Sequence, residues 1–253
     1  MEQSYRLGGG AFPTLIAIIS MFFVGVSGGA FDSMLSALLL TLFIVLGVCM
    51  TFAVSKVLSM TVLKGIPSSF TLELPPYRRP QIGKVIVRSV FDRTLFVLGR
   101  AIAVAAPAGL LIWIMANVQL DGITLLAHFS GFLDPFARLL GMDGVILMAF
   151  ILGLPANEIV IPIIIMAYMA QGSLLEFDSL AQLRDLLVNN GWTWITAVST
   201  MLFSLMHWPC TTTLLTIRKE SGSLKWTAMS FLVPTVCGIV LCFAFATVAR
   251  MFV

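Results

Sequence analysis

The chain has 253 residues, of which 59% are hydrophobic and only 11% are charged, and its mean hydropathy is +1.02. Soluble domains carry about 25% charged residues, so this composition excludes an ordinary soluble domain and predicts an integral membrane protein. The net charge of +3 is too small to indicate a nucleic-acid-binding surface.

Charge-poor windows approach the length of roughly 20 apolar residues that a helix needs to cross the hydrocarbon layer. Five of them predict membrane spans: Phe12–Val26, Ser33–Ser55, Ala101–Leu120, Leu186–Ile217 and Trp226–Ala249. The fourth window contains the sequence HWPC at positions 207–210. Because proline removes a backbone donor, we expect a broken helix over residues 192–217.

The apolar region Gly144–Met169 does not read as a simple span, because GLPANE at positions 153–158 interrupts it. Each half is too short to cross the membrane alone. The region is either one helix broken at mid-membrane or a re-entrant hairpin with its tip at Pro155–Glu158. Irregular backbone at such a depth is tolerated only inside protein or along a water-filled cavity.

The charge distribution favours the hairpin, which we expect over residues 144–170. With a hairpin, the segments on the side of the basic stretch Lys56–Arg93 hold ten basic residues and three acids, and the opposite segments hold two basic residues and seven acids. Because basic residues accumulate on the cytoplasmic side, this stretch and Arg218–Lys225 are predicted to be cytoplasmic.

On the outer side, Ile123–Leu140 and Leu174–Val188 carry apolar residues at helical spacing and are predicted to be interfacial amphipathic helices. The predicted fold is therefore an all-α integral membrane protein with about five spanning helices, a re-entrant helical hairpin and interfacial amphipathic helices.

Two segments share a plan of a short apolar stretch, a glycine-bearing polar break and a clean span. They are Phe12–Ser55 and Cys210–Ala249. The first break is acidic, at Asp32, and the second is basic, at Arg218 and Lys219. The two copies would thus face opposite ways, as do the inverted repeats of secondary transporters.

The residues that could carry chemistry gather at the two breaks. Glu158 is the only acid deep in an apolar region, where a carboxylate is costly, so it suggests a function; a protonated Glu158 bonded to a helix end is the structural alternative. His207 and Cys210 flank the second break, and imidazole and thiolate suit divalent transition metals, although their spacing fits packing equally well. The candidate ion-pathway residues are Glu158, Asn157, His207 and Cys210, and the candidate break residues are Gly153, Pro155 and Pro209.

Several enzyme motifs are absent from the sequence. It contains no phosphate-binding G-x-x-x-x-G-K-[ST], no H-E-x-x-H and no G-x-S-x-G. We therefore expect neither hydrolysis nor phosphoryl transfer by this chain, and no nucleotide bound to it.

Three sequence motifs resemble a known family. The segment SFTLELPPYRRP at positions 69–80 is similar to the linker of FeoB, the ferrous iron transport protein B family. GLPANEIVIP at positions 153–162 resembles the second Gate motif of that family, of the nucleoside-recognition type, and WPCTTT at positions 208–213 resembles the segment that follows it. The resemblance covers nearly the whole chain.

The resemblance implies a domain organisation. Residues 1–63 would be the tail of a first Gate module, with half of a broken helix and one span. Residues 64–93 would be a cytoplasmic amphipathic linker, and residues 94–253 a second Gate module. The G domain of FeoB and most of the first module are not found in the sequence, so we expect a fragment or one half of a split system.

The resemblance also implies a function, which is Fe²⁺ uptake across the cytoplasmic (inner) membrane of a prokaryote by a multi-pass permease. Fe²⁺ would be the transported substrate, and Cys210 and the Pro155–Glu158 break would line its path. The expected partners are the lipid bilayer and a G-domain protein or the remaining half of FeoB. A homo-oligomer is compatible with this expectation, and no nucleic-acid partner is expected. Two alternatives stay open: a Gate-type permease for another solute, such as a nucleoside, and a non-transporting membrane scaffold subunit.

Overall fold

A computed structural model describes residues 11–23, 30–61, 83, 95–120, 122–169 and 180–252. Nearly all of its regular structure is helical, in the order α1 (Ala11–Phe22), α2 (Ala30–Thr61), α4 (Phe96–Asn117), β1 (Gln119–Leu120), β2 (Ile123–Thr124), α5 (Leu125–Leu139), α6 (Gly144–Leu152), the 3₁₀ turn η3 (Asn157–Ile159), α7 (Val160–Met169), α8 (Leu180–Asn189), α9 (Trp194–Met206), α10 (Thr211–Ser221) and α11 (Leu224–Arg250). The expected all-α class of membrane protein is confirmed. Apart from residue 83, the predicted linker 64–93 lies outside the described residues.

Two helices in the described part of the chain are long and apolar enough to cross a membrane alone. They lie at Met34–Met60, within α2, and at Leu224–Arg250, which is α11. The other three predicted spans are shorter or divided: α1 has 12 residues, α4 has an apolar part of Ala101–Asn117, and the fourth window is split into α8, α9 and α10.

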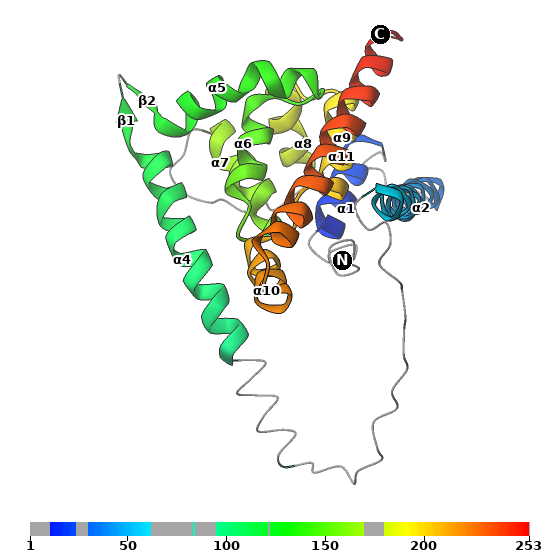
Figure 1. Ribbon diagram of the computed structural model, residues 1–253. Coiled ribbons are helices and arrows are strands. Elements are labelled where there is room, and N and C mark those ends of the chain that lie inside the picture. The colour runs from blue at the N-terminus through cyan, green and yellow to red at the C-terminus, as the bar shows by residue number, and fades with distance from the viewer. Residues whose placement is uncertain are drawn as a thin grey trace.

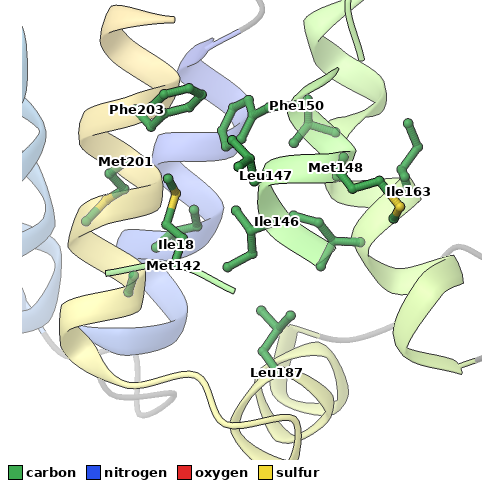
Figure 2. Packing of buried hydrophobic residues seen from close by; sticks show 14 of the residues in the cluster. Ile18, Met142, Ile146, Leu147, Met148, Phe150, Ile163, Leu187, Met201 and Phe203 are labelled. Atoms are coloured by element: carbon green, nitrogen blue, oxygen red, sulfur yellow. The ribbon is translucent and has the colours of Figure 1, made fainter. Parts of the chain in front are cut away.

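The protein core forms where α1, α6 and α9 meet (Figure 2). Ile18 of α1, Ile146 of α6 and Met201 of α9 are all completely buried. Figure 2 shows Phe150 and Phe203 facing each other across this junction, and their ring centroids are 4.8 Å apart in an edge-to-face arrangement. Three short helices thus occupy the interior, and the two long ones lie outside them with many apolar side chains exposed.

Helix α11 packs along α9 through small residues (Figure 1). Its buried positions recur every fourth residue, at Ser230, Pro234, Gly238, Cys242 and Ala246. A Cβ atom built on Gly238 would lie 3.4 Å from the backbone of Met206, the last residue of α9. Small residues at such spacing let two helix backbones approach closely, and here they bring α11 against the second break.

The legs of the predicted hairpin run antiparallel. Helices α6 and α7 pack on each other, and the Tyr168 hydroxyl near the end of α7 donates a hydrogen bond to the Asp143 carboxylate at the start of α6. This is the geometry that a hairpin requires, and it places GLPAN at its tip. In Figure 1 the tip points toward α10, whereas α5 lies at the opposite end of the hairpin.

The predicted interfacial helices appear with changed limits. Helix α5 starts at Leu125, because Ile123 and Thr124 pair with Gln119 and Leu120 in a small antiparallel ribbon that the prediction missed. Asp-Gly at positions 121–122 is a strong hairpin-turn signal, and Gly122 has φ +79°. Helix α8 begins at Leu180, and residues 170–179 of the second predicted helix lie outside the described part.

Candidate functional site

The two breaks, distant in sequence, lie against each other. The Leu154 carbonyl, in the first break, accepts hydrogen bonds from the backbone N–H of Thr211 at 2.9 Å and from the Thr211 hydroxyl at 3.2 Å. These residues are 57 positions apart and belong to the hairpin tip and to the first turn of α10. The structure therefore brings the predicted break residues Gly153, Pro155 and Pro209 into one region.

Local chemistry explains why the first break stands where it does. A Cβ atom on Gly153 would lie 2.7 Å from Val160 Cγ2 and 2.9 Å from the Ala149 carbonyl oxygen, so only glycine fits where α6 ends. Pro155, two residues later, cannot donate a backbone hydrogen bond. The chain consequently leaves the helix and re-enters regular structure only at η3.

The second break fixes the orientation of His207. Its Nδ1 lies 2.7 Å from the Ser204 carbonyl oxygen, which can only accept, so Nδ1 carries the proton and Nε2 presents a lone pair. The ring is surrounded by other rings, with centroids 5.5 Å away for Phe150, 6.5 Å for Phe203 and 6.3 Å for Trp208. The Nε2 lone pair is buried and has no hydrogen-bond partner among the described residues.

Unsatisfied polar atoms concentrate at this junction. Over the described residues, four buried side-chain nitrogen or oxygen atoms lack a hydrogen-bond partner, and three of them belong to the breaks: Asn157 Oδ1, His207 Nε2 and Trp208 Nε1. Buried polar groups in folded proteins are nearly always paired, with protein, water or ligand. Two lone-pair donors and one N–H at the breaks therefore suit a polar or hydrated ligand.

Cys210 adds a sulfur to the same region. It occupies the residue before α10, is half-buried, and its Sγ lies 3.1 Å from the hydroxyl oxygens of both Thr212 and Thr213. A helix N-terminus and two hydroxyl groups favour negative charge on the sulfur. The thiol is thus placed to act as a soft donor for a cation.

Glu158, which stands within an apolar region of the sequence, lies in η3 with its side chain exposed. Its neighbour Asn157 is half-buried and carries the unpaired oxygen. Within the described part of the chain, no three His, Cys, Asp or Glu side chains gather closely enough to hold a metal ion. Any protein ligands at the junction would therefore be completed by water, by the amide of Asn157 or by backbone carbonyls.

A second polar cluster, at the base of the hairpin, was not predicted. Asp143 accepts a hydrogen bond from the backbone N–H of Ile146 at 2.8 Å, capping α6, and another from the Tyr168 hydroxyl. Trp192 Nε1 donates to that hydroxyl at 2.8 Å, and the Trp192 ring stacks on Phe22 of α1. Burial raises the pKa of the Asp143 carboxyl, and the Tyr168 hydrogen bond opposes that rise. We call Asp143, Tyr168 and Trp192 the base cluster; its members are too far apart in sequence for any local pattern to reveal them.

Two family models match the sequence. One, described as Gate, nucleoside recognition, matches residues 98–224, which include both breaks. The other, described as ferrous iron transport protein B C terminus, matches residues 40–93.

Curated relatives match over most of the chain. An Fe(2+) transporter FeoB of Staphylococcus aureus (strain MSSA476) is 31% identical over 219 residues, which is 83% of this chain and 31% of the relative. A protein of the same name from Campylobacter jejuni is 25% identical over 96% of this chain and 40% of the relative. Another, from Synechocystis, is 30% identical over 77% of this chain and 31% of the relative. The chain thus spans about a third of the length of these relatives. No solved structure matches it.

Proposed function

The chain belongs to the Gate family and corresponds to the C-terminal membrane portion of FeoB proteins, and from this premise we propose that it is the membrane permease part of a ferrous iron uptake transporter. The observation that carries the proposal is the contact between the breaks at Leu154 and Thr211, together with the buried donors of the breaks that find no partner among the described residues. The protein would reside in the cytoplasmic membrane of a prokaryote and work together with a G domain.

The chemistry of the junction suits Fe²⁺ as a cargo. His207 offers an imidazole nitrogen and Cys210 a thiol, and both ligand types favour transition-metal ions over Mg²⁺ or Ca²⁺. Asn157 supplies an amide oxygen, and the exposed Glu158 would attract a cation to the hairpin tip. A transported ion must also leave, so a small number of protein ligands is an advantage.

Transport tests the proposal directly. The chain is reconstituted in liposomes together with a FeoB G domain and GTP, and entry of Fe²⁺ is followed under reducing conditions with a trapped chelating dye. We expect uptake above that of protein-free liposomes. Absence of uptake would overturn the proposal, provided that the protein is shown to be folded and inserted.

The role of Cys210 is tested by Co²⁺ binding. Thiolate ligation to Co²⁺ gives a charge-transfer band near the ultraviolet, and we expect Cys210→Ser to abolish this band. Cys237→Ser is the matched control, because Cys237 is half-buried on α11. An unchanged band in Cys210→Ser would show that Cys210 is a packing residue.

The description of the matched family model favours one other cargo, a nucleoside. The same liposomes, with radiolabelled uridine added to the outside, distinguish the two. Uridine uptake without Fe²⁺ uptake would replace iron with a nucleoside, and uptake of neither would favour a scaffold subunit.

A further inference from the structure

A groove of about 330 Å³ separates α4 from the two breaks. Leu154 and Thr211, the residues that join the breaks, both line it, as does Pro155. The wall on the side of α4 is one helix face, formed by Val104, Pro107, Ala108, Leu111 and Ile112. The groove is therefore a direct approach to the junction from the side that α4 covers.

Helix α4 is held loosely. It packs against α5, β2 and α10, and Ile112 is the only buried side chain among its residues whose side chains are described. Pro107, in the middle of the helix, cannot donate to the carbonyl of Ala103, and a proline at such a position bends or weakens a helix. The helix is thus weakened at Pro107, on the face that it turns toward the breaks.

The α4 wall of the groove is apolar. Val104, Ala108 and Leu111 offer no group that could replace the water ligands of an ion, so this wall disfavours a cation in the groove. Widening the groove by bending α4 would admit water and the ion together.

We propose that this groove is the route by which the cation reaches the junction, and that Val104, Ala108 and Leu111 form an apolar gate which opens when α4 bends at Pro107. The proposal rests on the proposed function for the identity of the ion. The gate itself is tested without iron, so the two can fail separately.

The test measures how fast a small, positively charged methanethiosulfonate reagent reaches the junction. Thr211→Cys provides the target thiol, in the full-length protein with its four native cysteines changed to serine. We expect Leu111→Ser, which places a hydroxyl group in the gate, to raise the labelling rate roughly tenfold. The matched control is Leu110→Ser: Leu110 is 59% exposed, close to the 51% of Leu111, but does not line the groove. Equal rates in both variants would overturn the proposal.

The bend is tested with Pro107→Ala, which restores a backbone N–H at position 107 that can donate a hydrogen bond to the Ala103 carbonyl. We expect slower labelling of Thr211→Cys and an unchanged or higher melting temperature in detergent. Gly109→Ala is a second stiffening change without a clash, because a Cβ atom there meets nothing within 4 Å. Labelling rates that neither change lowers would show that α4 does not bend to open the groove. If the gate variants behave as expected but no Fe²⁺ enters liposomes, the gate stands and the iron proposal fails.

Discussion

The two ends of the hairpin are built on opposite principles. At its base, Asp143 and Tyr168 satisfy each other's polar groups, and Trp192 joins them to the start of α9. At its tip, Asn157 keeps a buried oxygen that has no partner in the described part of the chain, and Glu158 is exposed. A fully paired polar cluster specifies one rigid arrangement. A buried polar group without a hydrogen bond has an unfavourable free energy, which a bound ligand can remove. The comparison indicates that the base anchors the hairpin and that the tip is reserved for binding.

Among substitutions at the base of the hairpin, Gly144→Ala is expected to lower the stability of the protein most. A Cβ atom there would lie 2.0 Å from the Ser130 carbonyl oxygen and 2.9 Å from the Asp134 backbone nitrogen, so α5 and α6 would have to separate. We expect a loss of more than about 3 kcal/mol in the free energy of unfolding, or failure to fold. Denaturation with SDS in mixed micelles measures it.

Gly131→Ala is the matched control for that substitution. Gly131 lies on α5, and a Cβ atom there meets nothing within 4 Å. The change should be neutral or stabilise the helix by about 0.5–1 kcal/mol. Similar losses in both variants would mean that glycine flexibility, and not close helix packing, matters at Gly144.

The next effect is that of Tyr168→Phe. It leaves the Asp143 carboxylate and the Trp192 N–H buried without their shared partner, which should cost about 1–3 kcal/mol. Asp143→Asn is the comparison, because asparagine keeps the oxygen that caps α6, and we expect it to cost less. If Tyr168→Phe is as stable as the wild type, the base cluster does not anchor the hairpin.

A smaller effect is expected between the breaks. Thr211→Val removes the hydroxyl bond to the Leu154 carbonyl but keeps the backbone bond, so the loss should be about 0.5–1.5 kcal/mol. Thr235→Val serves as a control, because its hydroxyl bonds only to the Phe231 carbonyl of its own helix. Equal unfolding free energies for the two variants would argue that the Leu154 contact adds nothing to the joining of the breaks.

The smallest stability effect belongs to Glu158→Gln. Its side chain is exposed, so we expect a change within about 0.5 kcal/mol, together with weaker binding of Co²⁺ because a negative charge is lost from the tip. Isothermal titration and thermal melting in the same detergent measure the two quantities. A destabilisation as large as that of Tyr168→Phe would contradict the contrast between tip and base.

The sequence predicted the features that rest on local composition. The spans in α2 and α11 follow from long apolar windows, and the breaks follow from glycine and proline at Gly153, Pro155 and Pro209. These signals are local because hydrophobic length and backbone chemistry act over a few residues.

Features that depend on distant pairing could not be predicted. Nothing near Leu154 indicates that its carbonyl meets Thr211, and no periodicity links Asp143 to Tyr168 or Trp192. The apolar neighbours of Glu158 do not indicate whether its side chain is enclosed; in the structure it lies in η3 and is exposed. Exposure in an irregular segment depends on the path of the backbone, which composition does not encode.

The small residues of α11 have a consequence for how this protein can change over evolutionary time. Ser230, Gly238, Cys242 and Ala246 differ in polarity but share a small volume; all four are buried, and Gly238 and Cys242 contact α9 at Met206 and Ser199. Natural selection at these positions acts on size, so serine, glycine, cysteine and alanine can replace one another while leucine cannot. On the opposite face of α11, where Val236 and Val240 are exposed, the reverse holds: side-chain volume is free to drift as long as the residue stays apolar. The two faces of one helix are therefore expected to accept different substitutions. An alignment of related sequences would then show which face of α11 packs against α9.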